Sequence, residues 1–137
     1  MYPRDYFATK EHSPEAGRIF VLMPYGADFV PVYRVIQEAI TGDETCFRAV
    51  RADELLGSRN VMREILEGVG RAEVVLADVT GRNPNVFYEL GVAHMVLPPE
   101  KVVIITQSDD DVPFDIRQYR YQSTTLQTTA SHSFTNI

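Results

Sequence analysis

A short apolar run followed by a polar turn and a helical pattern dominates the middle of the sequence. The run is Val-Val-Leu-Ala at residues 74–77, and Asp78 follows it directly. Pro84 suits the first turn of a helix, because the backbone N–H that proline lacks has no partner there. The pattern predicts a buried strand, a polar turn and an amphipathic helix. The predicted buried stripe of that helix consists of Val86, Leu90, Ala93 and Leu97.

The same alternation of apolar runs and helix-like segments extends over most of the chain. Strands alternating with helices favour a parallel sheet with right-handed crossovers. We therefore predict an α/β fold: an open, flavodoxin-like (Rossmann-like) parallel sheet of about five strands in the order 2-1-3-4-5, between helices in three layers. Strands are expected at residues 18–23, 47–52, 73–77 and 102–105, with an edge strand after residues 114–117, and helices at residues 30–40, 60–69 and 84–97.

Length and composition fit one globular domain. The chain has 137 residues, of which 45% are hydrophobic, enough for a single core. We expect an irregular leader at residues 1–16, the α/β domain at residues 17–122, and a separate C-terminal segment at residues 123–137. About half of that last segment is Ser or Thr and none of it is charged, so the sequence leaves its structure open.

Charge and hydropathy argue against several classes of protein. A net charge of -6 argues against a general nucleic-acid binder, although a local phosphate site stays open. No segment reaches the roughly 18 to 20 apolar residues that span a bilayer, so we expect no membrane partner. Charged residues interrupt the N-terminal region where a signal peptide would be apolar, and a cytoplasmic protein is expected.

The sequence shows no pattern typical of a metal or cofactor site. Cys46 is the single cysteine, which we expect to be buried, and no Cys/His spacing resembles a zinc site. Three consecutive carboxylates at residues 109–111 do not converge on one centre in an extended chain, so a solvated loop is favoured over a metal site. We expect neither metal nor cofactor.

The predicted strand order places two polar segments at one crevice. Strands one and three are neighbours in the order 2-1-3-4-5, and ligands bind outside the carboxyl ends of strands at such a switch point. Pro24, Tyr25 and Gly26 end the first strand, and Asp78 ends the third. Proline and glycine stop the strand and leave backbone N–H groups accessible to a ligand.

The helix that follows the central turn adds further polar side chains. Asn83 can cap its first N–H groups, and Asn85 is a second candidate cap. Glu89 is expected at the flank of the buried stripe, one turn after Asn85 and next to Tyr88. A carboxylate beside the core and facing Asp78 suits a reacting or binding group. In the alternative interpretation both residues have only structural roles. Glu89 is then an acid that the helix dipole favours in the first half of a helix, and Asp78 caps a turn.

Four other polar residues have both a functional and a structural interpretation. Asp53 follows the second strand and either reaches a ribose or is solvated. Arg59 and Arg82 are loop cations that either contact phosphate or face solvent. His94, about one turn beyond Glu89, is expected to be a packed or surface histidine rather than a catalytic base.

The segment from Ala77 to Ala93 resembles a known superfamily. Its core, Asp-Val-Thr-x-x-Asn-Pro-Asn-Val-Phe-Tyr-Glu-Leu-Gly-x-Ala, is similar to the nucleoside 2-deoxyribosyltransferase-like proteins. These include nucleotide N-glycosidases and nucleotide-binding domains of bacterial defence proteins, and they are distantly similar to TIR domains. The likeness extends from Arg18 to about Tyr121.

The resemblance implies chemistry at C1′ of a nucleoside or nucleotide. It assigns the nucleophile to Glu89 and a second acid, which helps the base leave or orients the sugar, to Asp78. Some hydrolases of the superfamily also use an acid on the helix before the third strand, where Glu64 and Glu67 show no clear match. The resemblance implies a homodimer as well, and Phe87 and Tyr88 with Met95 would supply apolar contact area.

Three functions therefore follow from the sequence. The first is a nucleoside or nucleotide N-glycosidase or 2-deoxyribosyltransferase that works through a carboxylate nucleophile. The second is a module that senses a nucleotide in the same crevice without turnover. The third is a TIR-like NAD hydrolase, which also relies on a helix glutamate.

Overall fold

The computed structural model describes residues 2–10, 12–42, 46–52 and 61–124 of the chain. Its strands are β1 (Arg18–Leu22), β2 (Arg48–Arg51), β3 (Val74–Asp78), β4 (Val102–Thr106) and β5 (Tyr121–Ser123). Its helices are α1 (Pro3–Thr9), α2 (Val30–Thr41), α3 (Val61–Arg71) and α4 (Pro84–Val96), with 3₁₀ turns η1 (Ala27–Phe29), η3 (Pro99–Lys101) and η4 (Asp109–Asp111).

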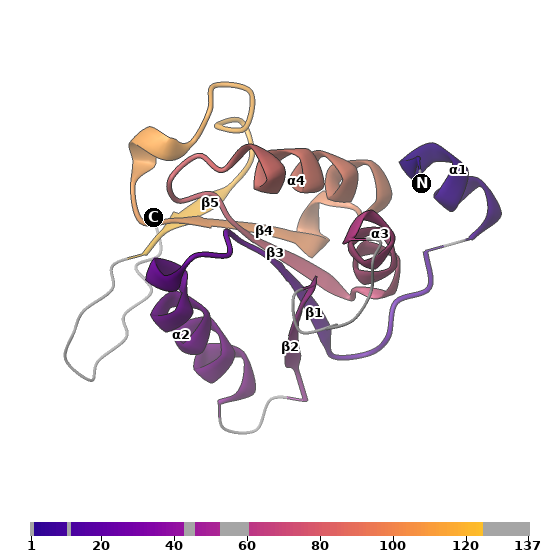
Figure 1. Ribbon diagram of the computed structural model, residues 1–137, viewed down its shortest axis with the longest axis horizontal. Helices are drawn as coiled ribbons and strands as arrows, with labels where there is room; N and C mark the ends of the chain where they lie inside the picture. Colours follow the sequence, from indigo (N-terminus) through magenta and orange to yellow (C-terminus); the bar gives the residue numbers. More distant parts are fainter. Residues whose placement is uncertain (1, 11, 43–45, 53–60, 125–137) are drawn as a thin grey trace.

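The five strands form one sheet in the order β2-β1-β3-β4-β5, and every neighbouring pair is parallel. This confirms the predicted flavodoxin-like order. The central strands read as apolar runs because helices cover both of their faces. As a result the carboxyl ends of β1 and β3 lie side by side, where the chain leaves the sheet for α2 and α4 (Figure 1).

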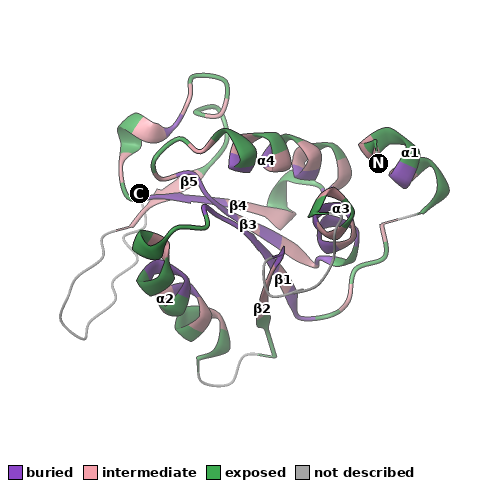
Figure 2. Cartoon of the chain, viewed as in Figure 1, coloured by how far each residue is buried: buried purple, intermediate pink, exposed green. Residues whose placement is uncertain are grey.

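The helices complete three layers around the sheet (Figure 1). On one face α2 packs through Val32, Tyr33 and Ile36 against the side chains of Val21 and Ile105. On the other face α3 and α4 bury a larger core, and the three central strands β1, β3 and β4 are mostly buried (Figure 2). The predicted stripe of α4 is confirmed, since these four residues are all buried: Val86, Leu90, Ala93 and Leu97.

The leader is not wholly irregular, because residues Pro3–Thr9 form α1. Tyr6 of this helix is buried, and Phe7 packs against the main core beside α3. The segment after α1 is fixed to the end of α3, where Ser13 N–H donates to the Gly70 carbonyl at 3.0 Å. Seven residues are too few to form a stable helix alone, so these tertiary contacts stabilise it.

The loop at residues 109–111 is more ordered than predicted. Residues Asp109–Asp111 form η4 instead of a purely solvated loop, and the Asp111 carboxylate accepts a hydrogen bond from Gly81 N–H at 2.8 Å. The Arg82 side chain faces solvent, at 63% exposure, and it also contacts this turn: its guanidinium donates to the Asp110 carbonyl and lies 3.5 Å from the Asp111 carboxylate. The η4 turn thus holds the loop that precedes α4.

Other predictions have mixed outcomes. Cys46 is exposed instead of buried, because it precedes β2 at the edge of the sheet. Within the described ranges, no helix has the length and apolar character that a bilayer crossing requires, and no cluster of His, Cys, Asp or Glu could hold a metal ion. The predicted edge strand exists as β5, whereas residues 125–137 lie outside the described part of the chain.

Candidate functional site

A pocket of about 540 Å³ opens at the carboxyl end of the sheet, between the residues after β1 and the first turns of α3 and α4. Of the predicted site residues, the structure brings Pro24, Tyr25, Asn83, Asn85, Tyr88 and Glu89 together in its lining. Gly26 and Asp78 do not line it, and Asp53 lies outside the described residues. Most of the predicted crevice therefore exists as a single cavity.

Asn83 fixes the start of α4 at the pocket. Its side-chain oxygen accepts hydrogen bonds from Asn85 N–H at 2.9 Å and Val86 N–H at 3.4 Å, which makes Asn83 the N-cap of the helix. Asn85 is not a cap, and its exposed side chain lines the pocket one turn before Glu89. The cap sets the orientation of the helix, and the helix presents the polar side chains.

Glu89 is the charged residue of this lining, and it lies among apolar surroundings. Burial raises the pKa of Glu89 from its usual value to about 7. Its carboxylate makes no hydrogen bond or ion pair with any residue that the structure describes. A half-buried carboxylate without a protein partner stores unfavourable desolvation, which a ligand with positive charge relieves.

Asp78 has a different environment. The residue is 1% exposed, and its Oδ1 accepts hydrogen bonds from Thr80 N–H at 3.0 Å and from the Thr80 hydroxyl at 2.6 Å. The Thr80 hydroxyl oxygen in turn accepts from Gln107 N–H at 2.9 Å, which links the ends of β3 and β4. Burial raises the pKa of Asp78, and the Thr80 hydrogen bonds partly oppose this rise. Asp78 thus closes the turn below the pocket.

The other side of the pocket is supported by stacked side chains. The guanidinium of Arg51, at the end of β2, lies 4.2 Å from the ring centre of Tyr33 and 5.4 Å from that of Tyr25. Such cation–π contacts hold the Tyr25 ring at the pocket mouth.

Sequence reasoning missed the apolar wall that α3 contributes. Val61, Met62 and Ile65 line the pocket, and only Ile65 is fully buried. Val61 lies one turn before Ile65 on the helix, but it is exposed at the pocket. The strand order could have indicated this wall, because the helix that follows β2 begins at the end of the sheet where β2 stops.

The fold with this pocket at its carboxyl end can be compared with known proteins. No protein-family model matches the chain, and no curated protein matches it. Among solved structures, it is similar to a 2-deoxyribosyltransferase from the psychrotolerant bacterium Bacillus psychrosaccharolyticus, with a TM-score of 0.58 and 14% identity over 76% of this chain and 84% of that one. The chain has the 2-deoxyribosyltransferase fold.

A second solved structure agrees with this result. The 2-deoxyribosyltransferase from Leishmania mexicana is similar with a TM-score of 0.50 and 16% identity, over 66% of this chain and 65% of that one. At this level of identity the likeness is one of fold, as the resemblance of the central motif predicted. The pocket lined by Glu89 occupies the switch point between β1 and β3, where ligands bind in open α/β sheets.

Proposed function

We propose that the protein cleaves or transfers the N-glycosidic bond of a nucleoside or nucleotide at C1′, with Glu89 as the nucleophile. The observation that supports this most is the desolvated Glu89 carboxylate in the lining of the pocket at the sheet's switch point. The names of the two structural neighbours, both 2-deoxyribosyltransferases, point to the same bond.

In this proposal Glu89 first attacks the sugar. A carboxylate oxygen forms a bond to C1′, the C1′–N bond breaks, and its electron pair leaves with the base, which takes up a proton. Water or a second base then attacks C1′ and releases the Glu89 carboxylate, giving hydrolysis or transfer. Positive charge develops at C1′ in both steps, and a poorly solvated carboxylate stabilises that charge more than a solvated one would.

The lining supports a flat base and a polar sugar. Met62, Ile65 and Val86 give an apolar wall, and the Tyr25 ring at the mouth offers a face for stacking. Asn83 and Asn85 lie beside Glu89, and their amide groups suit sugar hydroxyls. A volume of about 540 Å³ is within the range of small-molecule sites.

In this proposal Asp78, which does not line the pocket, orients the sugar indirectly. Its carboxylate accepts hydrogen bonds from Thr80, so Asp78 acts on the substrate by holding the turn between β3 and α4 in place. We therefore expect Asp78→Asn to lower turnover less than Glu89→Gln does.

The proposal includes a homodimer. Tyr88 is 52% and Met95 is 87% exposed on the outer face of α4, although Phe87 packs against the core and is not available as expected. A groove of about 570 Å³ between α1 and α4 is lined by Tyr88 and Met95 and adjoins the catalytic pocket through Tyr88. Large exposed apolar side chains beside a groove are typical of an interface.

The test is base release from a panel of nucleosides and nucleotides, ribo and 2′-deoxy, with NAD included. The wild type should release free base or exchange bases. Glu89→Gln should lower turnover on the order of 10³-fold or more while calorimetric binding changes little. Glu38→Gln, at an exposed position of α2 on the other face of the sheet, is the matched control. Binding without base release would identify a sensor, and release of nicotinamide from NAD would identify an NAD hydrolase. Turnover that survives Glu89→Gln would contradict the assignment of Glu89 as the nucleophile.

A further inference from the structure

The three consecutive aspartates at residues 109–111 have no role in the proposed reaction, although the structure uses each of them differently. The Asp109 carboxylate accepts a hydrogen bond from the Ser123 hydroxyl. The Asp110 side chain makes no hydrogen bond or ion pair with any residue that the structure describes. The Asp111 side chain is only 21% exposed and contacts the turn between β3 and α4. Asp111 is therefore the aspartate of this motif that bears on the catalytic pocket.

Asp111 contacts two residues of this turn that have a left-handed backbone. Gly81 has a φ of 81° and Arg82 a φ of 56°, a region that glycine adopts freely and arginine rarely does. One Asp111 oxygen accepts from Gly81 N–H at 2.8 Å, and the other lies 3.5 Å from the Arg82 guanidinium. An exposed ion pair contributes little by itself, whereas a hydrogen bond from a backbone N–H to a carboxylate is charge-assisted. The Gly81 hydrogen bond is thus the main contact that holds the turn.

The residue that follows this turn is Asn83, which lines the catalytic pocket. Its side-chain oxygen accepts from the N–H groups of Asn85 and Val86, so this oxygen is committed to the helix. The amide NH₂ group remains for a ligand, and it can only donate. Because the buried side chains of Val86 and Leu90 anchor α4 in the core, a change in the turn displaces Asn83 more than Glu89.

We propose that Asp111 is a positioning residue for substrate binding. It holds the left-handed turn in place, and the turn aims the amide NH₂ of Asn83 at an acceptor oxygen of the substrate's sugar. Asp111 does not line the pocket itself, so it acts through Asn83. This proposal rests on the proposed function, because it takes the catalytic pocket as the site of a nucleoside. It adds the direction of one contact, in which the protein donates and the sugar accepts.

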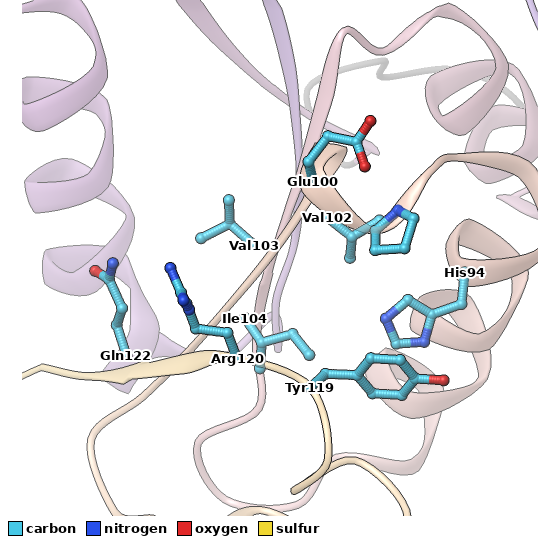
Figure 3. Close-up of a pocket in the computed structure, with 9 residues that line it drawn as sticks. His94, Glu100, Val102, Val103, Ile104, Tyr119, Arg120 and Gln122 are labelled. Carbon is cyan, nitrogen blue, oxygen red and sulfur yellow. The ribbon is translucent and has the colours of Figure 1, made fainter. Parts of the chain in front are cut away.

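Another pocket beside α4 lies apart from this turn. It has a volume of about 440 Å³ and contains the contact between the His94 and Tyr119 rings, whose centres are 4.6 Å apart (Figure 3). None of its described lining residues belongs to the turn or to η4, and none lines the catalytic pocket. A nucleoside bound there should not respond to substitutions of Asp111.

The experiment measures calorimetric binding of 2′-deoxyadenosine, 2′-deoxyguanosine, 2′-deoxycytidine and thymidine to Glu89→Gln, which should not consume them. In this background Asp111→Ala should weaken binding about fivefold. Asn83→Ser should weaken it about 10-fold, because serine retains a capping oxygen but lacks the amide donor. Asp110→Ala, in the same turn but without a side-chain partner among the described residues, is the control and should leave the affinity unchanged. Asp111→Asn keeps an acceptor for Gly81 N–H and should restore most of the affinity.

A double variant separates positioning from a general loss of structure. If Asp111 acts through Asn83, the variant with both Asp111→Ala and Asn83→Ser should bind no more weakly than Asn83→Ser alone, whereas independent effects would multiply to about 50-fold. In the enzyme that retains Glu89, Asp111→Ala should raise KM about fivefold and change kcat less than about twofold, as expected when binding common to ground and transition states is lost. A lower Tm without weaker binding would show a merely structural role and overturn the proposal.

The outcomes distinguish this proposal from the proposed function. Asp111-dependent binding in a protein that releases no base would support the positioning role while the proposed catalysis fails. Base release with an unchanged KM in Asp111→Ala would leave the catalysis in place and overturn the positioning role. Equal effects of Asp110→Ala and Asp111→Ala, multiplied effects in the double variant, or no saturable binding of any of these nucleosides at millimolar concentration would overturn it as well.

Discussion

The Oδ1 atom of Asp78 accepts hydrogen bonds from both the backbone N–H and the hydroxyl group of Thr80. The same hydroxyl oxygen accepts from Gln107 N–H, so one threonine joins the carboxyl ends of β3 and β4. Because Asp78 is buried, these two hydrogen bonds replace the ones that its carboxylate would form with water. The turn that leads to Asn83 and α4 depends on this pair.

Thr80→Val keeps the shape of the side chain and removes its hydroxyl. We expect a loss of about 1–3 kcal/mol in the free energy of unfolding, because a buried acceptor loses a partner. The pKa of Asp78 should rise further, since the removed hydrogen bond favoured its charged form. Denaturant unfolding and an NMR titration measure the two effects. Thr80→Ser keeps the hydroxyl and is the control; equal losses in both variants would contradict this role.

The rate of the proposed reaction should depend on the ionisation of Glu89. Only the carboxylate attacks C1′, and burial raises the pKa of Glu89 to about 7. We therefore expect kcat/KM to rise with pH through a midpoint near 7 and to level off at higher pH. This ratio reports the ionisation of the free enzyme. A pH–rate profile from about pH 5 to about pH 9 tests this, because it extends to both sides of the expected midpoint. A flat profile over that range would contradict the assignment.

Stability should show the opposite dependence on pH. The pKa of Glu89 is higher in the folded protein than in the unfolded chain, so between the usual pKa and about 7 the folded state binds more protons. The free energy of unfolding therefore decreases as pH rises through this window. Glu89→Gln removes the ionisable group and should raise Tm above the wild-type value at pH 8, with a smaller difference at pH 5. Thermal unfolding of both proteins at the two pH values decides the matter.

The contact between α3 and β1 permits a matched pair of glycine substitutions. A Cβ at Gly68 would lie 2.3 Å from the ring of Phe20, which is fully buried and has no room to move. Gly68→Ala should therefore destabilise the protein by about 1–3 kcal/mol. A Cβ at Gly91 of α4 meets nothing within 4 Å among the described residues, so Gly91→Ala should stabilise it by about 0.5–1 kcal/mol. Urea unfolding that gives the same sign for both would show that packing on Phe20 does not govern this contact.

The proposed homodimer depends on the outer face of α4. Met95→Lys places a charge at the centre of that apolar face and should shift the chain toward a monomer of 15.5 kDa in sedimentation at micromolar concentration. Phe114→Lys is the control, because Phe114 is as exposed, at 89% against 87% for Met95, but lies on the loop after η4. A wild type that sediments as a monomer would end the dimer proposal.

The sequence alone determined the order of the elements and the start of α4. Apolar runs and helical periodicity are local properties of the chain, so they located β1, β3, β4 and the buried stripe of α4. Asn83 before Pro84 was sufficient to predict the cap, since capping needs only neighbouring residues. The strand order followed from chain length and the general rules for parallel sheets.

Tertiary structure decided the environment of each polar side chain. The sequence did not show that the Asp78 carboxylate bonds to Thr80 while Glu89 stays without a protein partner, because burial depends on elements far apart in the chain. It also did not show α1, which is stabilised by α3, or the role of Asp111 in holding Gly81. Contacts between distant residues form only when the sheet and helices assemble, and the chemistry of the pocket follows from that assembly.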